Sequence, residues 1–362
     1  MRHLWQTGPM SRSDLAQASG LAHNEVGRIA GELIERRLVR EGPPTVGGRG
    51  RPPVPLHLNA PTMRVLAVTV SPGRVQLVDI DLCGHPVGHV THRKVASPGQ
   101  IIRTAAAAMR RAIGQQTIAV GLSVPGLIDS GGRRLLLSSA APGGEPLDLD
   151  PLIEAADGLP LIVQNDMHAL AAQWLVARRL PVEQDTLLVR LDDGELGAAM
   201  IIHGRPNRGS IWGSNELGHT RLPVITDRCY CGHIGCLERI CSTAFLHRVD
   251  RRRRGVLARR AAECDPKDTA LAQMIDLLAT GIGNAVNFVR PHRLVLIGSL
   301  MRCGDFADAL VSGIRRGTLD ALAERLRVDR WDQTETSEAE PAGWLALAEL
   351  YFGSWSALPL GR

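Results

Sequence analysis

The stretch that decides the fold begins with Asn-Glu-Leu-Gly-His at residues 215–219 and, after nine residues, continues with Cys-Tyr-Cys-Gly-His-Ile-Gly-Cys-Leu-Glu at residues 229–238. Zinc in structural sites is held by four nitrogen or sulfur donors in a closed tetrahedron. Two glycines beside the cysteines let the backbone turn tightly enough to aim three sulfurs at one point. We therefore expect one structural zinc ion per chain, held by His219, Cys229, Cys231 and Cys236. The alternative is three buried thiols beside an unrelated histidine, and His233 is a rival donor that lies close to the cysteines in sequence.

Two glutamates, Glu216 and Glu238, flank the expected zinc ligands. If residues 216–219 form a helical turn, Glu216 and His219 lie on the same face of it. One ring nitrogen of His219 would then bind zinc, while the other N–H would face a bound ligand in a tautomer fixed by the metal. The stretch therefore predicts a ligand site next to the metal.

This pattern, Glu-Leu-Gly-His followed by Cys-x-Cys-Gly-x-x-Gly-Cys-Leu-Glu, resembles the signature of the repressor–open-reading-frame–kinase (ROK) family. That family contains bacterial sugar kinases and sugar-responsive transcription regulators. The resemblance covers residues 62–362 and implies an actin-like, ribonuclease-H-like body of two lobes. The zinc stretch is its most specific part.

The composition is that of a soluble globular protein with two or three domains: 362 residues, 44% apolar and 22% charged. We expect neither a membrane span nor a targeting leader, and reduced thiols on zinc fit the cytoplasm. A net charge of +5 permits nucleic-acid binding. Aromatic residues make up only 3% of the chain, which argues against stacking platforms for single strands.

The N-terminal residues carry the pattern of a helix-turn-helix. Residues 11–14 read as a capping box, Gly20 makes the turn, and a second helix capped by His23 or Asn24 follows. Its apolar positions keep helical spacing, at Val26, Ile29, Ala30, Leu33 and Ile34. Gly27 inside it costs roughly 1 kcal/mol of helix propensity. We expect Asn24, Glu25 and Arg28 to contact DNA bases. The alternative to a helix-turn-helix is a generic helical hairpin with a linker.

Two short strands, Leu38–Arg40 and Pro55–Leu58, flank a Gly/Pro/Arg-rich excursion at residues 47–53 and complete a winged helix. Arg49 and Arg51 on this thin backbone suit a narrow minor groove. Residues 1–62 hold eight arginines against five acidic residues. They resemble the winged-helix half of the ROK regulators, including the Gly-Arg-Pro element. A flexible linker is the alternative for the excursion.

From residue 64 onward, short apolar strands alternate with helices, which favours an α/β body with two lobes and a cleft. The expected helix is Ile101–Ile113, and the expected strands are Val65–Val70, Arg74–Asp81, Ile118–Val124, Leu161–Asp166, Thr186–Leu191, Ala198–Ile202 and Leu294–Ile297. We divide the chain into a winged helix (1–60), a first lobe (61–167), a second lobe with the zinc site and dimerisation helices (168–343), and a C-terminal helix returning to the first lobe (344–362). Trp344, Tyr351, Phe352 and Trp355 predict that this helix packs on the first lobe or on a second copy.

The family's kinases hold ATP with two phosphate loops, and both depart from the family pattern here. The first, Thr69–Gly73, lacks the Asp of Asp-x-Gly-x-Thr, and Pro72 removes a backbone donor. The second, Asp192–Gly197, places three carboxylates where phosphate oxygens would lie. The family's kinases also have a pair of glycines on the adenosine side of the site, and the matching residues here are Gly298 and Ser299. These departures argue against a working kinase.

The residues that match the sugar-binding part of the family's site are present in this sequence. The resemblance assigns ligand contacts to Asn165, Asp166, Glu216, His219 and Glu238, with Asp166 matching the kinases' general base. His168 stands where the family commonly has Asn, and these groups could instead serve only the zinc fold. We expect a non-enzymatic repressor that binds double-stranded operator DNA as a homodimer or higher oligomer and responds to a sugar or sugar phosphate. The alternatives are an ATP-dependent sugar kinase with an added DNA-binding domain and a zinc-stabilised protein-interaction module.

Overall fold

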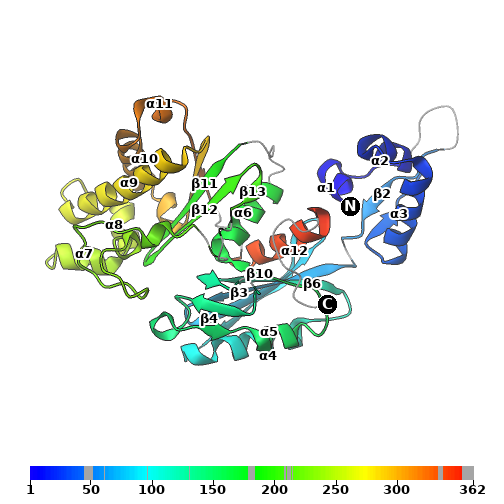
Figure 1. Ribbon diagram of the computed structural model, residues 1–362, viewed down its shortest axis with the longest axis horizontal. Helices are drawn as coiled ribbons and strands as arrows, with labels where there is room; N and C mark the ends of the chain where they lie inside the picture. The colour runs from blue at the N-terminus through cyan, green and yellow to red at the C-terminus, as the bar shows by residue number, and fades with distance from the viewer. Residues whose placement is uncertain are drawn as a thin grey trace.

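The computed structural model describes residues 1–44, 52–60, 62–95, 97–129, 131–177, 184–207, 209, 213, 215–332 and 337–352. A small N-terminal head, residues 1–58, lies beside a larger body of two lobes (Figure 1). The head contains α1 (Arg2–Thr7), α2 (Arg12–Ser19), α3 (His23–Glu35) and an antiparallel hairpin of β1 (Val39–Glu41) and β2 (Leu56–Leu58). Its core consists of Leu4, Ala30, Val39 and Leu56.

Local signals explain where the two longer head helices begin and end. The Ser11 hydroxyl accepts from the Asp14 N–H, and the Asp14 carboxylate accepts from the Ser11 N–H, so the expected capping box is confirmed. Gly20 ends α2 in the left-handed region at φ 71°. The expected cap of α3 is wrong: Ala22 is the N-cap, because its extended backbone lets the helix begin at His23. The excursion of residues 47–53 lies outside the described residues up to Arg51.

The first lobe is built on a five-stranded sheet in the order β10-β6-β3-β4-β5. Its strands are β3 (Arg64–Ser71), β4 (Arg74–Asp81), β5 (Pro86–Lys94), β6 (Thr117–Val124) and β10 (Leu161–Asn165). Alternate β3 residues point to opposite faces, so Leu66 and Val68 meet α4 (Ile101–Ala112) and α5 (Asp150–Ala155). Val65 and Ala67 meet α6 (Asp166–Ala177) and α12 (Glu340–Phe352) on the other face.

The second lobe repeats this plan in the order β13-β12-β11-β14-β15. In both sheets an antiparallel meander is extended by two parallel strands. The strands are β11 (Thr186–Asp192), β12 (Glu195–Ile202), β13 (Arg205–Pro206), β14 (Arg293–Ile297) and β15 (Arg327–Trp331). The helices of this lobe are α7 (Thr243–Val249), α8 (Leu257–Glu263), α9 (Thr269–Val289), α10 (Gly304–Gly317) and α11 (Asp320–Ala323). A small sheet of β7 (Leu127–Ile128), β8 (Arg134–Leu137) and β9 (Leu147–Asp148) adjoins the first lobe. The expected α/β body is confirmed.

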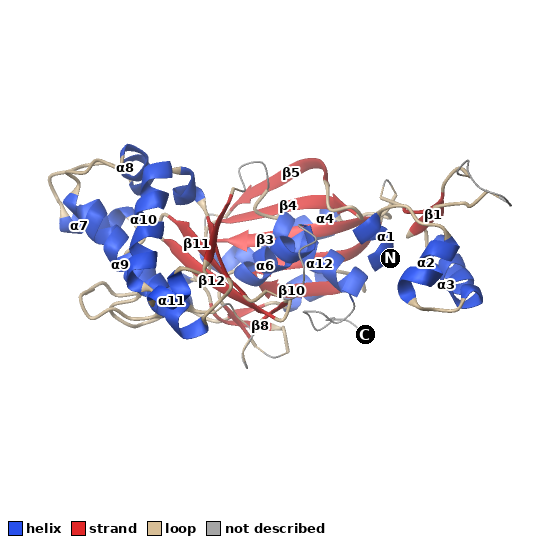
Figure 2. Cartoon of the chain, turned by 90° about the horizontal axis from the view of Figure 1, so that it is seen from above, coloured by secondary structure: helices blue, strands red, loops and turns tan. Residues whose placement is uncertain are grey.

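Two helices connect the lobes and the head. Helix α6 begins at Asp166 and can be followed in Figure 2. It packs on both sheets, since Ala169 and Ala172 belong to the core of the first lobe and Met167 and Trp174 contact the second lobe. Helix α12 begins at Glu340, four residues before the expected boundary, and lies against β3 and β6. A Cβ atom on Gly121 would lie 1.8 Å from the Ala342 carbonyl oxygen, so this glycine permits the close approach.

Helix α12 also contacts the head. Trp5 of α1 lies edge-on to Trp344, with ring centroids 6.3 Å apart, and stacks on Tyr351 at 5.8 Å. The Tyr351 hydroxyl donates to the Leu82 carbonyl, which ties the end of α12 to the first lobe. The terminal aromatics Trp344 and Tyr351 therefore pack on the first lobe, which is one of the two expectations for them. Within the described ranges, no helix combines the length and the apolar character that crossing a bilayer requires.

Candidate functional site: a cleft beside a thiol cluster

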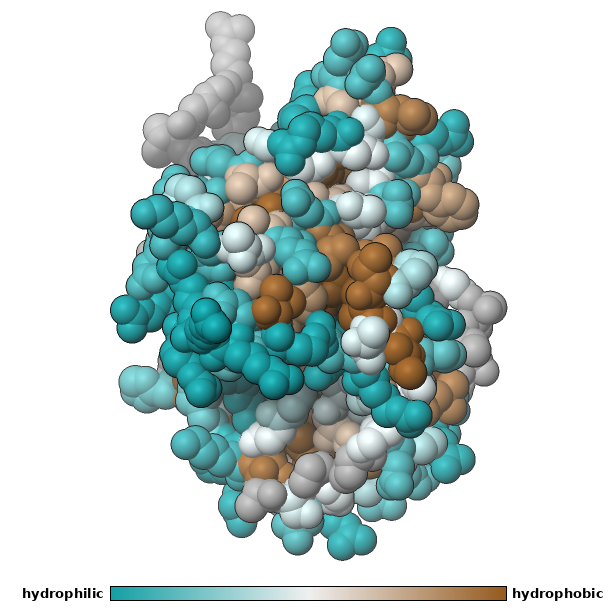
Figure 3. Space-filling view, turned by 90° about the vertical axis from the view of Figure 1, so that its left-hand side faces the viewer, coloured by the Kyte–Doolittle hydropathy of each residue, from teal (hydrophilic) through white to brown (hydrophobic). Residues whose placement is uncertain are grey.

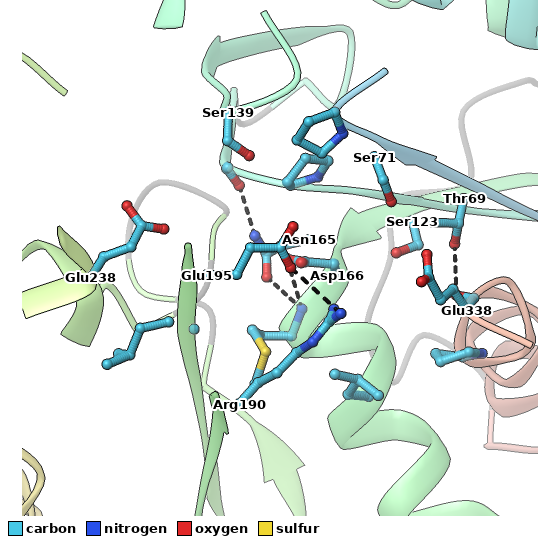
Figure 4. A pocket seen from close by; sticks show the side chains of 18 of the residues that line it. Thr69, Ser71, Ser123, Ser139, Asn165, Asp166, Arg190, Glu195, Glu238 and Glu338 are labelled. Atoms are coloured by element: carbon cyan, nitrogen blue, oxygen red, sulfur yellow. Dashed lines mark hydrogen bonds and ion pairs between the residues drawn. The ribbon is translucent and has the colours of Figure 1, made fainter. Parts of the chain in front are cut away.

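A cavity of about 140 Å³ is lined by residues of both lobes (Figure 4). Thr69, Ser71 and Ser123 come from the first lobe, Asn165 and Asp166 from the junction of β10 and α6, and Glu338 from the residues before α12. The second lobe contributes Arg190, Glu195, Glu216, His219, Tyr230 and Glu238. The structure therefore brings the five expected ligand-binding residues to one cavity.

Asn165 and Asp166 lie where β10 ends and α6 begins. The Asn165 side chain donates to the Gly126 carbonyl at 2.9 Å and accepts from the Met167 N–H at 2.8 Å. Its amide is therefore largely occupied in holding the strand–helix junction. Asp166 accepts from the same N–H at 3.0 Å, and burial raises its pKa while the charge of Arg190 opposes that rise. Asp166 thus presents a carboxyl group to the cavity that suits a hydroxyl donor.

His219 stands between the cavity and the thiols. It closes a short 3₁₀ turn, Leu217–His219, in which its N–H donates to the Glu216 carbonyl at 3.1 Å. Its Nδ1 lies 3.6 Å from the Cys229 sulfur, and its Nε2 lies 3.1 Å from the Tyr230 hydroxyl and 3.7 Å from a Glu216 oxygen. Burial lowers the pKa of His219, which favours the neutral ring that binds metals. Tyr230 was not singled out from the sequence, although it lies between two expected ligands.

The donor atoms of His219, Cys229, Cys231 and Cys236 all lie within 4.8 Å of one another. The Cys231 and Cys236 sulfurs are 3.6 Å apart, close to the edge of about 3.8 Å expected for a tetrahedron with 2.3 Å zinc–sulfur bonds. Burial raises the pKa of the Cys229 thiol to about 12, so a cation is needed to keep it deprotonated at neutral pH. This cluster can hold a metal ion. His233 lies on its exposed side, 3.6 Å from Cys231.

The backbone of residues 221–236 shapes the cluster. The Cys229 N–H donates to the His233 carbonyl at 2.8 Å, which closes the turn around two of the cysteines. Gly235 has φ 95°, and a Cβ atom there would lie 3.1 Å from the Leu222 carbonyl oxygen. A side chain at that position would therefore be strained, which explains the glycine.

The second phosphate loop differs from expectation. Asp192 accepts hydrogen bonds from the Ser299 N–H at 2.7 Å and hydroxyl at 2.6 Å, and from the Arg190 Nε at 2.7 Å. Asp193 accepts from the Thr243 N–H at 2.8 Å, at the start of α7. Only Glu195 of the three carboxylates lines the cavity, with an oxygen 3.5 Å from Arg190. The expectation that all three occupy a phosphate position is wrong, because backbone and guanidinium donors draw two of them away.

The first phosphate loop and the turn at Gly298-Ser299 also lack features that nucleotide binding would need. Pro72 lines the cavity and has no backbone N–H that could donate to a phosphate. Gly298 has φ 111°, and a Cβ atom there would lie 2.3 Å from the Leu191 carbonyl oxygen. The turn at Gly298-Ser299 is therefore packed on β11 and has its donors satisfied by Asp192.

The expected DNA contacts lie on the head, away from the cavity. Asn24, Glu25 and Arg28 are exposed on α3, on the face opposite buried Val26 and Ala30. Arg28 forms an ion pair with Glu32 at 2.5 Å. Arg49 and Arg51 lie outside the described residues.

Comparison with known proteins places this geometry in a family. A family model described as "ROK family" matches residues 89–349. The DNA-binding transcriptional repressor Mlc of Escherichia coli is 25% identical over 366 aligned positions, which cover 90% of this chain and 86% of the repressor. The N-acetylglucosamine repressor of Shigella flexneri is 24% identical, covering 90% and 86%.

Solved structures agree on the fold. A ROK family transcriptional regulator described as a homolog of the E. coli MLC protein matches with a TM-score of 0.80 and 24% identity, covering 97% of this chain and 95% of that one. A ROK hexokinase from Thermus thermophilus matches with a TM-score of 0.63 and 23% identity, covering 80% and 99%. The kinase thus has no counterpart for a fifth of this chain.

Proposed function

The chain belongs to the ROK family, and from this premise we propose that it is a DNA-binding transcriptional repressor of carbohydrate or amino-sugar metabolism. The observation that carries the proposal is the head: a helix, a glycine turn and an amphipathic helix with an exposed polar face stand in front of a kinase-like body. The matched regulator covers this part of the chain and the matched hexokinase leaves a fifth of the chain uncovered. The named repressors among the relatives support the same class of function.

The head acts as a winged helix-turn-helix on double-stranded operator DNA. Helix α3 enters the major groove with Asn24, Glu25 and Arg28, and Arg49 and Arg51 reach the minor groove from the wing. The ion pair between Arg28 and Glu32 holds that arginine in place until a base or phosphate competes for it. Binding DNA places the repressor in the cytoplasm.

The body acts without phosphoryl transfer. A nucleotide would need free backbone donors at its phosphates. Pro72 has none, and those of the turn at Ser299 are taken by Asp192. The cavity instead keeps groups that bind hydroxyls, and Asp166, Glu216 and Glu238 surround a sugar as its effector site. One structural zinc on His219, Cys229, Cys231 and Cys236 holds the loop that carries two of these glutamates.

A route for the signal runs from the cavity to the head along α12. Glu338 lines the cavity, forms an ion pair with Arg74, and accepts from the Thr69 hydroxyl through its carbonyl at 3.1 Å. The helix that follows carries Trp344 and Tyr351, on which Trp5 of the head rests. A ligand that moves Glu338 therefore shifts the support of the head, with a coupling of typically 1–3 kcal/mol.

The repressor acts as a homodimer, because helix-turn-helix proteins read paired half-sites. Its dimer surface is a groove between α9 and the loop of residues 215–222, lined by Leu187, Met200, Leu217, Leu222, Ala285 and Phe288. Phe288 is 88% exposed, which is unusual for a phenylalanine in a monomer. Figure 3 shows apolar side chains gathered on this end of the body. A second copy is the occupant that operator symmetry requires.

The test is recovery of genomic DNA fragments on the purified full-length protein, followed by sequencing. We expect a palindromic site next to sugar-metabolism genes, and release of that DNA by one sugar of a panel. Asp166→Ala should abolish the release and leave operator affinity unchanged, because residue 166 belongs to the cavity and not to the head. Sugar-dependent ATP turnover would instead establish the kinase alternative. If the Asp166→Ala protein still released DNA when the sugar was added, the effector would have to bind outside this cavity.

A further inference from the structure

We infer that the joint between the head and the body is a second ligand site, which takes a small organic anion with a planar apolar ring. The site is a cleft of about 590 Å³ between the β1–β2 hairpin of the head, the turn that joins β4 to β5, and Trp344 of α12. It adjoins the contact between α1 and α12, which lie next to each other in Figure 1. This inference goes beyond the proposed function, because it needs neither operator DNA nor the sugar cavity.

One wall of the cleft is aromatic and rigidly packed. Trp5 of α1 and Trp344 of α12 both line the cleft, although only 5% and 6% of their surfaces are exposed. Gly84, in the turn before β5, has φ 90°, and a Cβ atom there would lie 2.1 Å from the Trp344 ring. The glycine therefore lets this turn lie directly against the indole. Leu4 and Leu58 extend the apolar lining. Aromatic and aliphatic walls of this kind bind planar apolar groups.

The head supplies a positive charge. Arg40 of β1 and His57 of β2 are directly opposite each other in the hairpin, so their side chains lie on the same face, and both line the cleft. The next residue, Glu41, points to the other face and forms an ion pair with Arg12 at 2.8 Å. Within the described part of the chain, the Arg40 side chain has neither a hydrogen-bond nor an ion-pair partner. The hairpin therefore presents a guanidinium to the cleft without a counter-ion.

The carboxylate in the turn of the body is already engaged. Asp81 ends β4 and accepts from the Cys83 N–H at 2.8 Å and from the His85 N–H at 2.9 Å, and its second oxygen lies 3.4 Å from the His85 Nδ1. These contacts hold the turn in which His85 lines the cleft. Neither aspartate nor glutamate occurs among the described lining residues. The cleft is therefore complementary in charge to an anion.

A ring nitrogen of His57 also lacks a partner. Its Nε2 is buried, and no described residue forms a hydrogen bond with it. A Cβ atom on Gly42 would lie 2.4 Å from this nitrogen, so the glycine provides the space that the ring occupies. A buried polar atom without a partner costs free energy. An imidazole N–H can donate to an anion, so a shift of the ring toward a ligand in the cleft would give this nitrogen a partner.

The size and place of the cleft agree with a ligand site. Pockets for small molecules typically have about 300–1,000 Å³ and often lie between domains, with apolar walls and a few polar groups. A cleft of about 590 Å³ falls within that range. An anion bound there touches both Arg40 of the head and Trp344 of the body, so it stabilises the joint between them. The alternative is a seam that holds only water.

The experiment is titration calorimetry of the full-length protein, without DNA or sugar, with four probes that share one ring system. The probes are 2-naphthoate, 2-naphthyl phosphate, 2-naphthamide and 2-naphthol. We expect at least one of the two anions to bind about 10-fold more tightly than both neutral compounds, because hydrogen bonds to charged groups are the stronger ones. The comparison of the carboxylate with the phosphate shows which charged group the cleft takes.

Three variants test the assignment. Arg40→Gln should weaken binding of the preferred anion by about 10-fold and leave the affinity for 2-naphthamide unchanged. Arg36→Gln changes an exposed arginine of the head that does not line the cleft, and it should bind every probe as the wild-type protein does. Asp166→Ala, in the sugar cavity, should also leave probe binding unchanged. Circular dichroism establishes that each variant is folded, and His57→Gln replaces Arg40→Gln if that variant is not.

A second measurement reports on the joint itself. Limited proteolysis between residues 41 and 64 should slow when the preferred anion is added to the wild-type protein, because the ligand holds the head on the body. The same anion should have no such effect on Arg40→Gln. An effect of equal size in Arg40→Gln and in the wild-type protein would overturn the role of this arginine.

The remaining outcomes decide against the inference in different ways. Equal affinity for anions and neutral probes would show that the cleft does not select charge. If no probe binds at millimolar concentration, the cleft is a water-filled seam, and the proposed repressor function is unaffected. If Asp166→Ala abolishes binding, the probes occupy the sugar cavity and the second site falls.

Discussion

The ring of Trp5 stacks on the ring of Tyr351 with centroids 5.8 Å apart and planes inclined by 22°. This contact joins the first helix of the head to the last described helix of the body. Trp5 is 5% exposed and belongs to the same apolar cluster as Trp344, Tyr351 and the first-lobe sheet. The head is therefore held on the body by side chains and not only by the chain that connects them.

Removing Trp5 should release the head. Trp5→Ala deletes a buried ring and should cost about 3–5 kcal/mol at this contact. We expect faster limited proteolysis between residues 41 and 64 and a weaker release of DNA by the effector, since α12 loses its support for the head. Tyr351→Phe is the control, because it keeps the stacked ring and removes only the hydroxyl that donates to Leu82. Unchanged proteolysis of Trp5→Ala would show that the head is fixed by other contacts.

Removing one thiol should remove the metal. Metal analysis of purified protein should give one zinc per chain, and Cys231→Ala should lower both the zinc content and the melting temperature, because metal binding contributes directly to folding in small closed sites. Cys303→Ala removes a thiol outside the cluster and should retain full zinc. Full zinc in Cys231→Ala would exclude this cysteine as a ligand.

The sequence was sufficient for features that short patterns encode. The capping box at Ser11, the continuous apolar run of β3 and the donor spacing around Cys229 each depend on residues close together in the chain, so their geometry follows from local chemistry. Helix α1 was not predicted, because six residues are too few to display a helical period. The relation of Trp5 to Tyr351 depends on residues at opposite ends of the chain, which no local pattern can reveal.

The cavity shows the same limit. The pairing of Asp192 with Ser299 joins residues 107 apart in sequence, so the carboxylates of the second phosphate loop were expected in the cleft although two of them lie elsewhere. Arg190 reads as an ordinary strand residue, and only the folded hairpin brings its guanidinium between Asp192 and Glu195. Glu338 likewise enters the cavity through tertiary packing.

The wing arginines should contribute to DNA binding through phosphates. Changing both Arg49 and Arg51 to Ala should weaken operator binding and reduce the salt slope by up to about 2, since each lost phosphate contact removes about 0.9. Fluorescence anisotropy across a salt series measures the slope. Changing Arg103 and Arg111, on a helix of the first lobe, to Ala is the matched control. A slope equal to that of the wild-type protein would show that the excursion is only a linker.

The groove at Phe288 should hold the dimer together. Phe288→Glu places a charge on an 88% exposed apolar side chain, so we expect a monomer by light scattering and a large loss of affinity for a palindromic operator. Val256→Glu changes another exposed apolar residue, outside the groove, and should leave the mass unchanged. A dimeric Phe288→Glu protein would place the interface elsewhere.

The last prediction is a pH dependence of stability at Glu195. Burial raises the pKa of this carboxyl above its usual 4.5, although Arg190 opposes the rise. The folded state then binds the proton more tightly than the unfolded state, so the contribution of Glu195 to stability is greatest below pH 4.5 and falls as the pH rises above that value. Glu195→Gln removes this penalty and leaves Arg190 paired with Asp192. We therefore expect the difference in melting temperature between Glu195→Gln and the wild-type protein to increase in favour of the variant from pH 4 to pH 8. This change should have the same sign at every salt concentration. Glu145→Gln accounts for the loss of one exposed carboxyl group. If the variant instead loses stability relative to the wild-type protein as the pH rises, the ion pair with Arg190 outweighs the cost of burial.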